Sequence, residues 1–192
     1  MRFPRLPFFR RFRDFARDQR GIAAVEFAVL ASVLTTALLG GTELARYTLM
    51  HQKMDRVSSS VSNWVAQSNN MTTTDFDNMF AAAGQVAKPF ALDAANGKVI
   101  ISFIVAETNS TYRVSWQRTG TGTISQASKI GTQGGLATMP EGVTMKQGDT
   151  LVAVEVFALY QAFVFPELIG TSIIYHRSFD QPRLVDVITV TN

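Results

Sequence analysis

The sequence predicts an α+β fold in which one long N-terminal α-helix, its first half transmembrane, packs on a small antiparallel β-sheet domain. Three observations predict it: an apolar run over residues 22–42, apolar residues that recur every three or four positions beyond it, and four β-rich segments after residue 97. The periodic stretch favours a helix with one apolar face, which a sheet can cover. The 192 residues are enough for one modest domain and an accessory element.

The chain opens with a basic leader. Residues 1–21 hold seven arginines and two aspartates, a net charge of +5, whereas the whole chain carries +3. Positive charge beside an apolar segment favours the cytoplasm, so residues 1–21 are predicted to be cytoplasmic. The remainder is slightly acidic, which argues against a nucleic acid as a partner. The chain has no cysteine, which excludes disulfides and thiolate metal sites.

The segment after the leader is long and apolar enough to cross a bilayer. It reads GIAAVEFAVLASVLTTALLGGT from Gly21 to Thr42. As a helix, residues 22–42 would extend about 30 Å, the thickness of the hydrocarbon core. The run is long for a secretory signal peptide, and no A-x-A cleavage site follows it cleanly. We therefore expect a transmembrane helix surrounded by membrane lipid, and an uncleaved anchor is the alternative that span and charge alone leave open.

Glu26 is the one charged residue of this segment, and it lies five residues after Gly21. A carboxylate inside hydrocarbon costs a few kcal/mol, so one that is retained there usually has a partner or a function. Glu26 therefore favours a functional segment over a plain anchor.

The sequence from Arg20 to Phe27, RGIAAVEF, resembles the processing site of prepilins, in which a basic leader ends in glycine and the mature chain carries glutamate at its fifth position. The resemblance implies that a prepilin peptidase cleaves between Gly21 and Ile22 and removes the leader. It also implies that Glu26, with Phe27 beside it, serves in docking, where the glutamate pairs with the new α-amino group of a neighbouring subunit.

The segment RGIAAVEFAVL is more particularly similar to the TadE-like minor pseudopilins of the tight-adherence (Tad, or Flp) pilus, and the resemblance covers residues 10–50. This resemblance implies a pilin-like subunit that takes part in assembling or initiating an adhesive pilus. Its implied partners are the prepilin peptidase, other pilins and pseudopilins, and the pilus assembly machinery. The implied location is a bacterial inner membrane, with 43–68 as a periplasmic continuation of the helix and 69–192 as a periplasmic α+β domain. The alternative function is an uncleaved, membrane-anchored periplasmic binding or interaction module.

The helix is expected to continue beyond the membrane. Apolar residues recur at steps of three and four from Leu44 to Trp64, so the helix is predicted to end near Gln67. The stretch 72–75 reads as a new N-cap, and a second helix is predicted from about Asp75 to Val86.

Four segments are predicted to be strands, and residues 119–149, rich in Gly, Thr, Ser and Gln, a long loop with at most one edge strand. The strands are Lys98–Ala106, Thr111–Arg118, Leu151–Phe163 and Ser172–Phe179, with a hairpin turn at Asn109-Ser110 between the first two. Strict alternation would place Tyr112, Val114 and Trp116 on one face of the sheet. Trp64, Trp116 and the group Phe157, Tyr160, Phe163 and Phe165 are expected to be core residues.

Little in the sequence indicates catalysis. The two histidines, His51 and His176, are far apart in the chain, and nothing in the sequence suggests that the fold brings them together. We therefore predict no enzyme activity, no catalytic or metal site, no cofactor and no small-molecule substrate.

Overall fold

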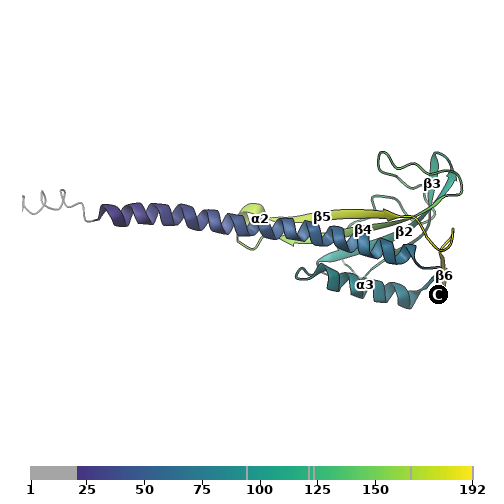
Figure 1. Ribbon diagram of the computed structural model, residues 1–192, viewed down its shortest axis with the longest axis horizontal. Helices are drawn as coiled ribbons and strands as arrows, with labels where there is room; N and C mark the ends of the chain where they lie inside the picture. Colours follow the sequence, from purple (N-terminus) through teal and green to yellow (C-terminus); the bar gives the residue numbers. More distant parts are fainter. Residues whose placement is uncertain (1–20, 94, 121, 123, 165, 192) are drawn as a thin grey trace, which may run out of the picture. The chain divides into compact units, whose positions relative to one another are not determined.

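The computed structural model describes residues 21–93, 95–120, 122, 124–164 and 166–191, and it confirms the α+β fold (Figure 1). The basic leader up to residue 20 lies outside the described residues. The elements are α2 (Ile22–Ala66), β1 (Asn70–Thr72), α3 (Thr73–Ala87), β2 (Gly97–Thr108), β3 (Thr111–Thr119), β4 (Thr150–Gln161), α4 (Pro166–Ile169), β5 (Thr171–Asp180) and β6 (Thr189–Thr191). The chain divides into two compact units, one ending at Leu44 and a globular unit over Ala45–Asn192.

The first unit contains the beginning of α2, which carries apolar side chains on all sides. An 18-residue window of α2 has a mean hydropathy of 2.1, and none of it is buried within the chain, so this helix is long and apolar enough to span a membrane. The hydroxyls of Ser32 and Thr36 donate to the carbonyl oxygens of Ala28 and Ser32, at 2.8 and 2.9 Å. These bonds satisfy the hydroxyls inside the helix, as an apolar environment requires.

The second part of α2, in the globular unit, has the predicted apolar face. Met50, Met54, Val57, Val61 and Val65 are all buried and belong to one core cluster with the sheet. The predicted helix is therefore confirmed to within a residue at its end. The expected start of the apolar face is wrong, because Leu44 is 66% exposed and the first buried apolar residue of α2 is Met50.

Helix α3 begins at the predicted N-cap. Thr72 accepts a hydrogen bond from the backbone N–H of Asp75 at 3.2 Å, and the Asp75 carboxylate accepts one from the Thr72 N–H at 2.8 Å. This reciprocal capping box satisfies two N–H groups that helix formation leaves without partners. Phe76, Ala83 and Ala87 then face the core.

The four predicted strands form one antiparallel sheet in the order β3-β2-β4-β5. The turn at Asn109-Ser110 is confirmed, because Thr108 pairs with Thr111 on either side of it. The loop between β3 and β4 carries one isolated bridge, Arg113 to Leu136, in place of an edge strand.

A β-bulge in β3 overturns the expected alternation. Phe103 pairs with Trp116 but Ile104 pairs with Val114, so Ser115 is an extra residue that shifts the register. Trp116 therefore faces the helices, stacked on Phe103 at 5.4 Å between ring centroids, whereas Val114 belongs to the cluster on the opposite face. A single inserted residue reverses the facing of the residues beyond it because side chains alternate with a period of two.

The central strand β4 is buried on both faces. Val152, Val154 and Val156 pack on the helices, while Leu151 and Ala153 face a second cluster closed by Ile130 and Met145 of the long loop. The sequence predicted the helix-covered face only. The loop covers the other, so it is part of the core.

The expected aromatic core is correct in part. Trp116, Phe157 and Tyr160 are buried, and Trp64 is partly buried against the same cluster. Phe163 is wrongly predicted, because it follows the end of β4 and is 76% exposed. Phe165 lies outside the described residues.

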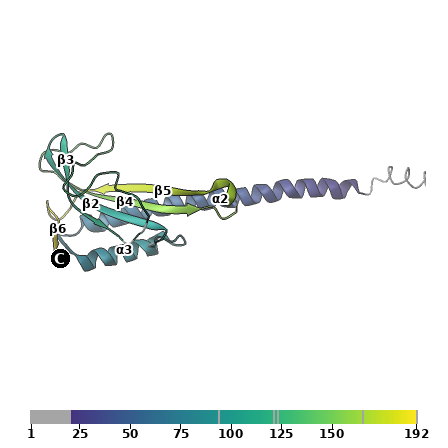
Figure 2. The same ribbon diagram turned by 180° about the vertical axis from the view of Figure 1, so that it is seen from behind.

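The last part of the chain forms a strap that the sequence did not indicate. The Trp116 Nε1–H donates to the carbonyl oxygen of Ile188 at 3.0 Å, and the Arg183 N–H donates to the carbonyl oxygen of Ala66 at 2.9 Å. Strand β6 then pairs in parallel with β1. Figures 1 and 2 both show β6 at the end of the globular unit where α3 starts. The strap thereby fixes the end of α2 to the sheet.

Candidate functional site

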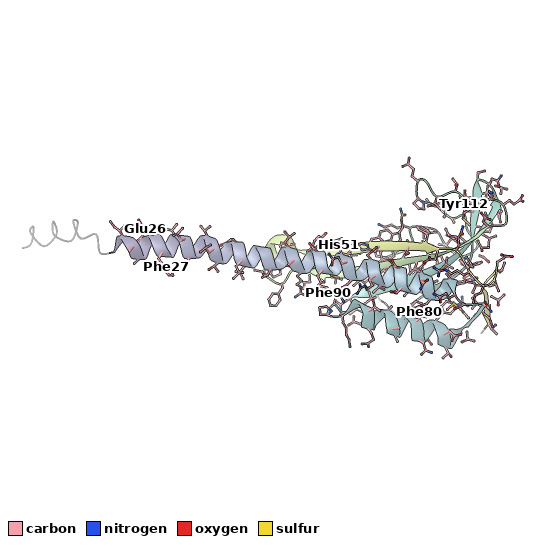
Figure 3. The ribbon with its side chains drawn as sticks, viewed as in Figure 1. Glu26, Phe27, His51, Phe80, Phe90 and Tyr112 are labelled. Atoms are coloured by element: carbon pink, nitrogen blue, oxygen red, sulfur yellow. The ribbon has the colours of Figure 1, made fainter. Side chains whose placement is uncertain are left out.

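The predicted processing and docking segment lies at the start of α2. Ile22 is the first helical residue, and the carbonyl oxygen of Gly21 accepts the first helical hydrogen bond, from the Val25 N–H at 3.1 Å. Gly21 thus stands just before the helix, as a scissile position that releases an intact helix would. Glu26 and Phe27 follow one turn later, and both side chains extend away from the helix (Figure 3).

The described fold does not itself require glycine at position 21. A Cβ atom built there meets no other atom within 4 Å, and Gly21 is not among the glycines with a positive φ. A larger residue would therefore fit sterically and conformationally. The described fold therefore gives no reason for glycine at this position.

Glu26 is exposed, and within the described part of the chain no hydrogen bond or ion pair engages its carboxylate. Ile22 and Glu26 are four residues apart, so they share one side of the helix. Around them Ile22 is 49% exposed, Val25 64% and Phe27 72%. The structure thus presents an exposed acidic group framed by exposed apolar side chains.

The globular unit contains a contact that the sequence did not suggest. His51 Nδ1 of α2 lies 3.0 Å from His176 Nε2 of β5, and the Asp55 carboxylate lies 3.7 Å from His176 Nδ1. Asp55 favours a proton on Nδ1, so His176 Nε2 accepts from His51 Nδ1–H. Burial and the nearby His51 lower the pKa of His176, against the opposing effect of Asp55. The sequence held no sign of this contact because 125 residues separate the two histidines.

This histidine pair holds few of the groups that a metal or catalytic site needs. Among the described residues, no group of three or more His, Asp or Glu side chains is placed to share a metal ion. His51 Nε2 is buried and has no partner within the described chain. The pair joins α2 to β5, and its chemistry is that of a partly buried hydrogen bond that responds to protonation.

The sequence also missed a buried carboxylate. Glu155 lies in the middle of β4 and is fully buried, and it accepts hydrogen bonds from the Ser128 hydroxyl, the Lys129 N–H at 2.8 Å and the Tyr175 hydroxyl at 2.9 Å. Burial and the adjacent Glu155 raise the pKa of Tyr175. An acidic residue within an apolar strand was the available signal. The cluster fastens the long loop to the sheet.

The fold defines the class of α+β proteins in which one long helix with an apolar first part packs its second part on a small antiparallel sheet. Residues 21–62 of the chain match the family described as TadE-like protein. The match confirms the predicted TadE-like resemblance over this segment and supports a component associated with the Tad pilus. No curated protein and no solved structure gives a significant match.

The matched segment covers the whole candidate site. It begins at Gly21 and extends through the apolar part of α2 to Ser62, within the face that packs on the sheet. Proteins of the matched family are structural components of the Tad pilus, whose partners are in general pilins and assembly machinery.

Proposed function

We propose that this chain is a minor pilin-like subunit that a prepilin peptidase processes after Gly21 and that helps to assemble or initiate a Tad/Flp-type adhesive pilus. In this function the helix anchors the subunit in the inner membrane by a single span, with the N-terminus cytoplasmic and the globular unit periplasmic. The subunit then enters the pilus or its base, where other pilins and the assembly machinery are its partners.

The observation that carries the proposal is the pairing of Gly21 with Glu26 at the start of an apolar helix. The glycine meets no steric need of the described fold, and the carboxylate has no partner in the described chain. A plain anchor would gain from an apolar residue at position 26, since a carboxylate in hydrocarbon costs about 2.5–3.5 kcal/mol. Both residues are explained if one is read by a peptidase and the other by a neighbouring subunit.

Cleavage would also supply the missing counter-charge. A chain that begins at Ile22 carries an α-amino group with a pKa near 8, which is mostly protonated at neutral pH. In the helix this cation lies one turn from Glu26 of its own chain, and it is equally able to pair with Glu26 of an adjacent subunit. The intermolecular pair would fix the axial register of packed helices, because a shifted register leaves two charges in lipid.

The first test is the N-terminus of the protein recovered from cells that express the Tad machinery. Intact-mass analysis should find a chain that begins at Ile22. Gly21→Leu should block this trimming while the protein still inserts in the membrane, because the fold accepts a side chain there. Gly40→Leu is the matched control, since a Cβ at Gly40 also meets nothing within 4 Å, and it should be trimmed normally. A mature chain that retains its leader would favour the uncleaved binding module instead.

A further inference from the structure

One end of the globular unit exposes several apolar side chains. Phe163 is 76% exposed, Ile169 of α4 is 51% exposed and Ile173 of β5 is 41% exposed. Gln161 pairs with Thr171, so the chain leaves β4 and returns in β5 at this end. Figures 1 and 2 show α4 at the end of the globular unit opposite to β6 and the C-terminus. These three residues and the α4 turn are called the α4 end below.

The α4 end lies next to the first residues of α2 in the same unit. The Arg46 guanidinium carbon lies 5.5 Å from the centre of the Phe163 ring and 5.8 Å from that of Phe90. A hollow beside this contact is lined by residues of four segments: Arg46 and Met50 of α2, Pro89 to Ala91, Asn96, and Leu159 to Gln161 of β4. The α4 end therefore lies beside Arg46, near the start of the globular unit's part of α2.

The chain itself keeps Arg46 near the expected membrane boundary. Arg46 follows Thr42, the last residue of the predicted span, by four residues. Both residues belong to the continuous helix α2, in which four residues advance about 6 Å along the axis. The headgroup layer adds about 5–8 Å beyond the hydrocarbon core on each side. The contact with Arg46 thus holds Phe163 within reach of that layer.

We propose that the α4 end is a membrane-contacting surface, with Phe163, Ile169 and Ile173 immersed in the headgroup layer of the bilayer that α2 crosses. Phenylalanine and aliphatic side chains form the apolar face of segments that lie in this layer, and an arginine stacked on aromatic rings keeps its charge in the polar layer while its stem lies on apolar surface. Arg46 is the cation that stacks on Phe163, and one arginine attracts anionic lipid far less than a polybasic cluster does. In this proposal apolar burial, and not attraction to anionic lipid, drives the contact. The proposal rests on the membrane span within the proposed function.

The absence of cysteine allows a direct depth measurement on the full chain. Phe163→Cys, Ile169→Cys and Leu184→Cys each introduce a single thiol for a nitroxide label, and Leu184, which is 63% exposed in the C-terminal strap, is the matched control. The labelled proteins are reconstituted in phosphatidylcholine vesicles, with and without phosphatidylglycerol. Collision of the label with oxygen, which concentrates in lipid, is compared with collision with a water-soluble nickel complex.

The labels at 163 and 169 should favour oxygen several-fold more than the label at 184, equally in both lipid mixtures. A label at 163 that is as open to the nickel complex as the one at 184 would overturn the proposal. So would labels shielded from both reagents with spin–spin broadening, since these would place a second copy of the chain on the surface. If the labels at 163 and 169 favour oxygen only in vesicles that contain phosphatidylglycerol, charge attraction and not apolar insertion drives the contact, and the stated mechanism is overturned.

A fourth label separates this proposal from the function on which it rests. Val33→Cys lies within the apolar part of α2, where Val33 is 61% exposed. If the label at 33 is in lipid and the one at 163 is in water, only the membrane-contacting surface fails. If the label at 33 is itself in water, the single-span anchor fails and the α4 end loses its basis.

Discussion

Two carboxylates of this chain lie in apolar stretches, and their surroundings differ. Glu155 is enclosed by Ser128, the Lys129 N–H and Tyr175, so the fold itself satisfies it. Glu26 has no such partner among the described residues. An unsatisfied carboxylate in hydrocarbon is costly, and a satisfied one is a structural fastener. The difference supports a role for Glu26 outside its own chain.

Glu26→Ala should leave processing and membrane insertion intact and reduce incorporation of the subunit into the pilus. Removing one member of a buried ion pair costs about 3–5 kcal/mol, so the fraction found in sheared pili should fall at least tenfold. Glu26→Gln keeps the shape and loses the charge, and it should behave like the alanine variant. The measurement is an immunoblot of pilus and membrane fractions, with the N-terminal mass of the retained protein.

The matched control is Glu141→Ala, which removes an exposed acid of the globular unit. It should reach the pilus at the unmodified level. If Glu26→Ala reaches the pilus as well as Glu141→Ala does, the docking role of Glu26 is wrong, whatever the N-terminus proves to be.

The difference between these carboxylates also shows what residue-level analysis can predict. Glu26 could be singled out from the sequence because the features that indicate its role are close to it, namely the glycine before it and the apolar run after it. Glu155 was missed because its partner Ser128 lies 27 residues away in a loop. Phe163 was misplaced for a similar reason, since its exposure depends on where β4 ends.

At the scale of elements, α2 and β5 are joined by the pair of His51 and His176 beside Asp55. The pKa of His176 is lowered by burial and by His51, so the unfolded chain takes up a proton before the folded chain does. Where the unfolded state binds more protons, the free energy of unfolding falls as the pH falls. Stability is therefore complete above the unfolded pKa of about 6.5 and declines below it.

Urea unfolding of the solubilised full chain, followed by tryptophan fluorescence, should show this decline between pH values of about 7.5 and 5.5. His176→Asn removes the titrating group and should flatten the dependence. Asp55→Asn removes the charge that raises the pKa of His176, so it should steepen the decline. An unchanged slope in His176→Asn would show that other groups set the pH response.

The elements themselves were largely predictable because helices and strands have short sequence periods. The second part of α2, helix α3 and four strands follow from apolar spacing and turn residues. The pair β1 and β6 could not be predicted in this way. Strands of three residues are too short to show a periodic pattern, and the paired residues lie 119 positions apart. The bulge at Ser115 was equally unpredictable from the sequence, since it depends on the pairing of β3 with β2.

At the scale of the molecule, the buried and exposed apolar residues separate along the chain. Every residue of the two core clusters lies at or beyond Met50, whereas most large apolar residues between Ile22 and Leu44 are more than half exposed. The two compact units divide at Leu44, which agrees with this separation. The globular unit thus contains its own core, and the first unit needs an apolar environment from outside the chain.

A fragment that begins at Ala45 should therefore fold by itself in water. Its near-UV circular dichroism should match that of the full chain, because Trp116 keeps its stacking on Phe103 and its bond to Ile188. Its melting temperature should lie within about 4 °C of the solubilised full chain, a shift equivalent to about 1 kcal/mol for a chain of this size. Ile188→Ala in the fragment is the control for a real core, since truncating a fully buried isoleucine costs about 2–5 kcal/mol and should lower the melting temperature well beyond that range. A fragment with no cooperative transition would show that residues before Ala45 are needed to complete the globular unit.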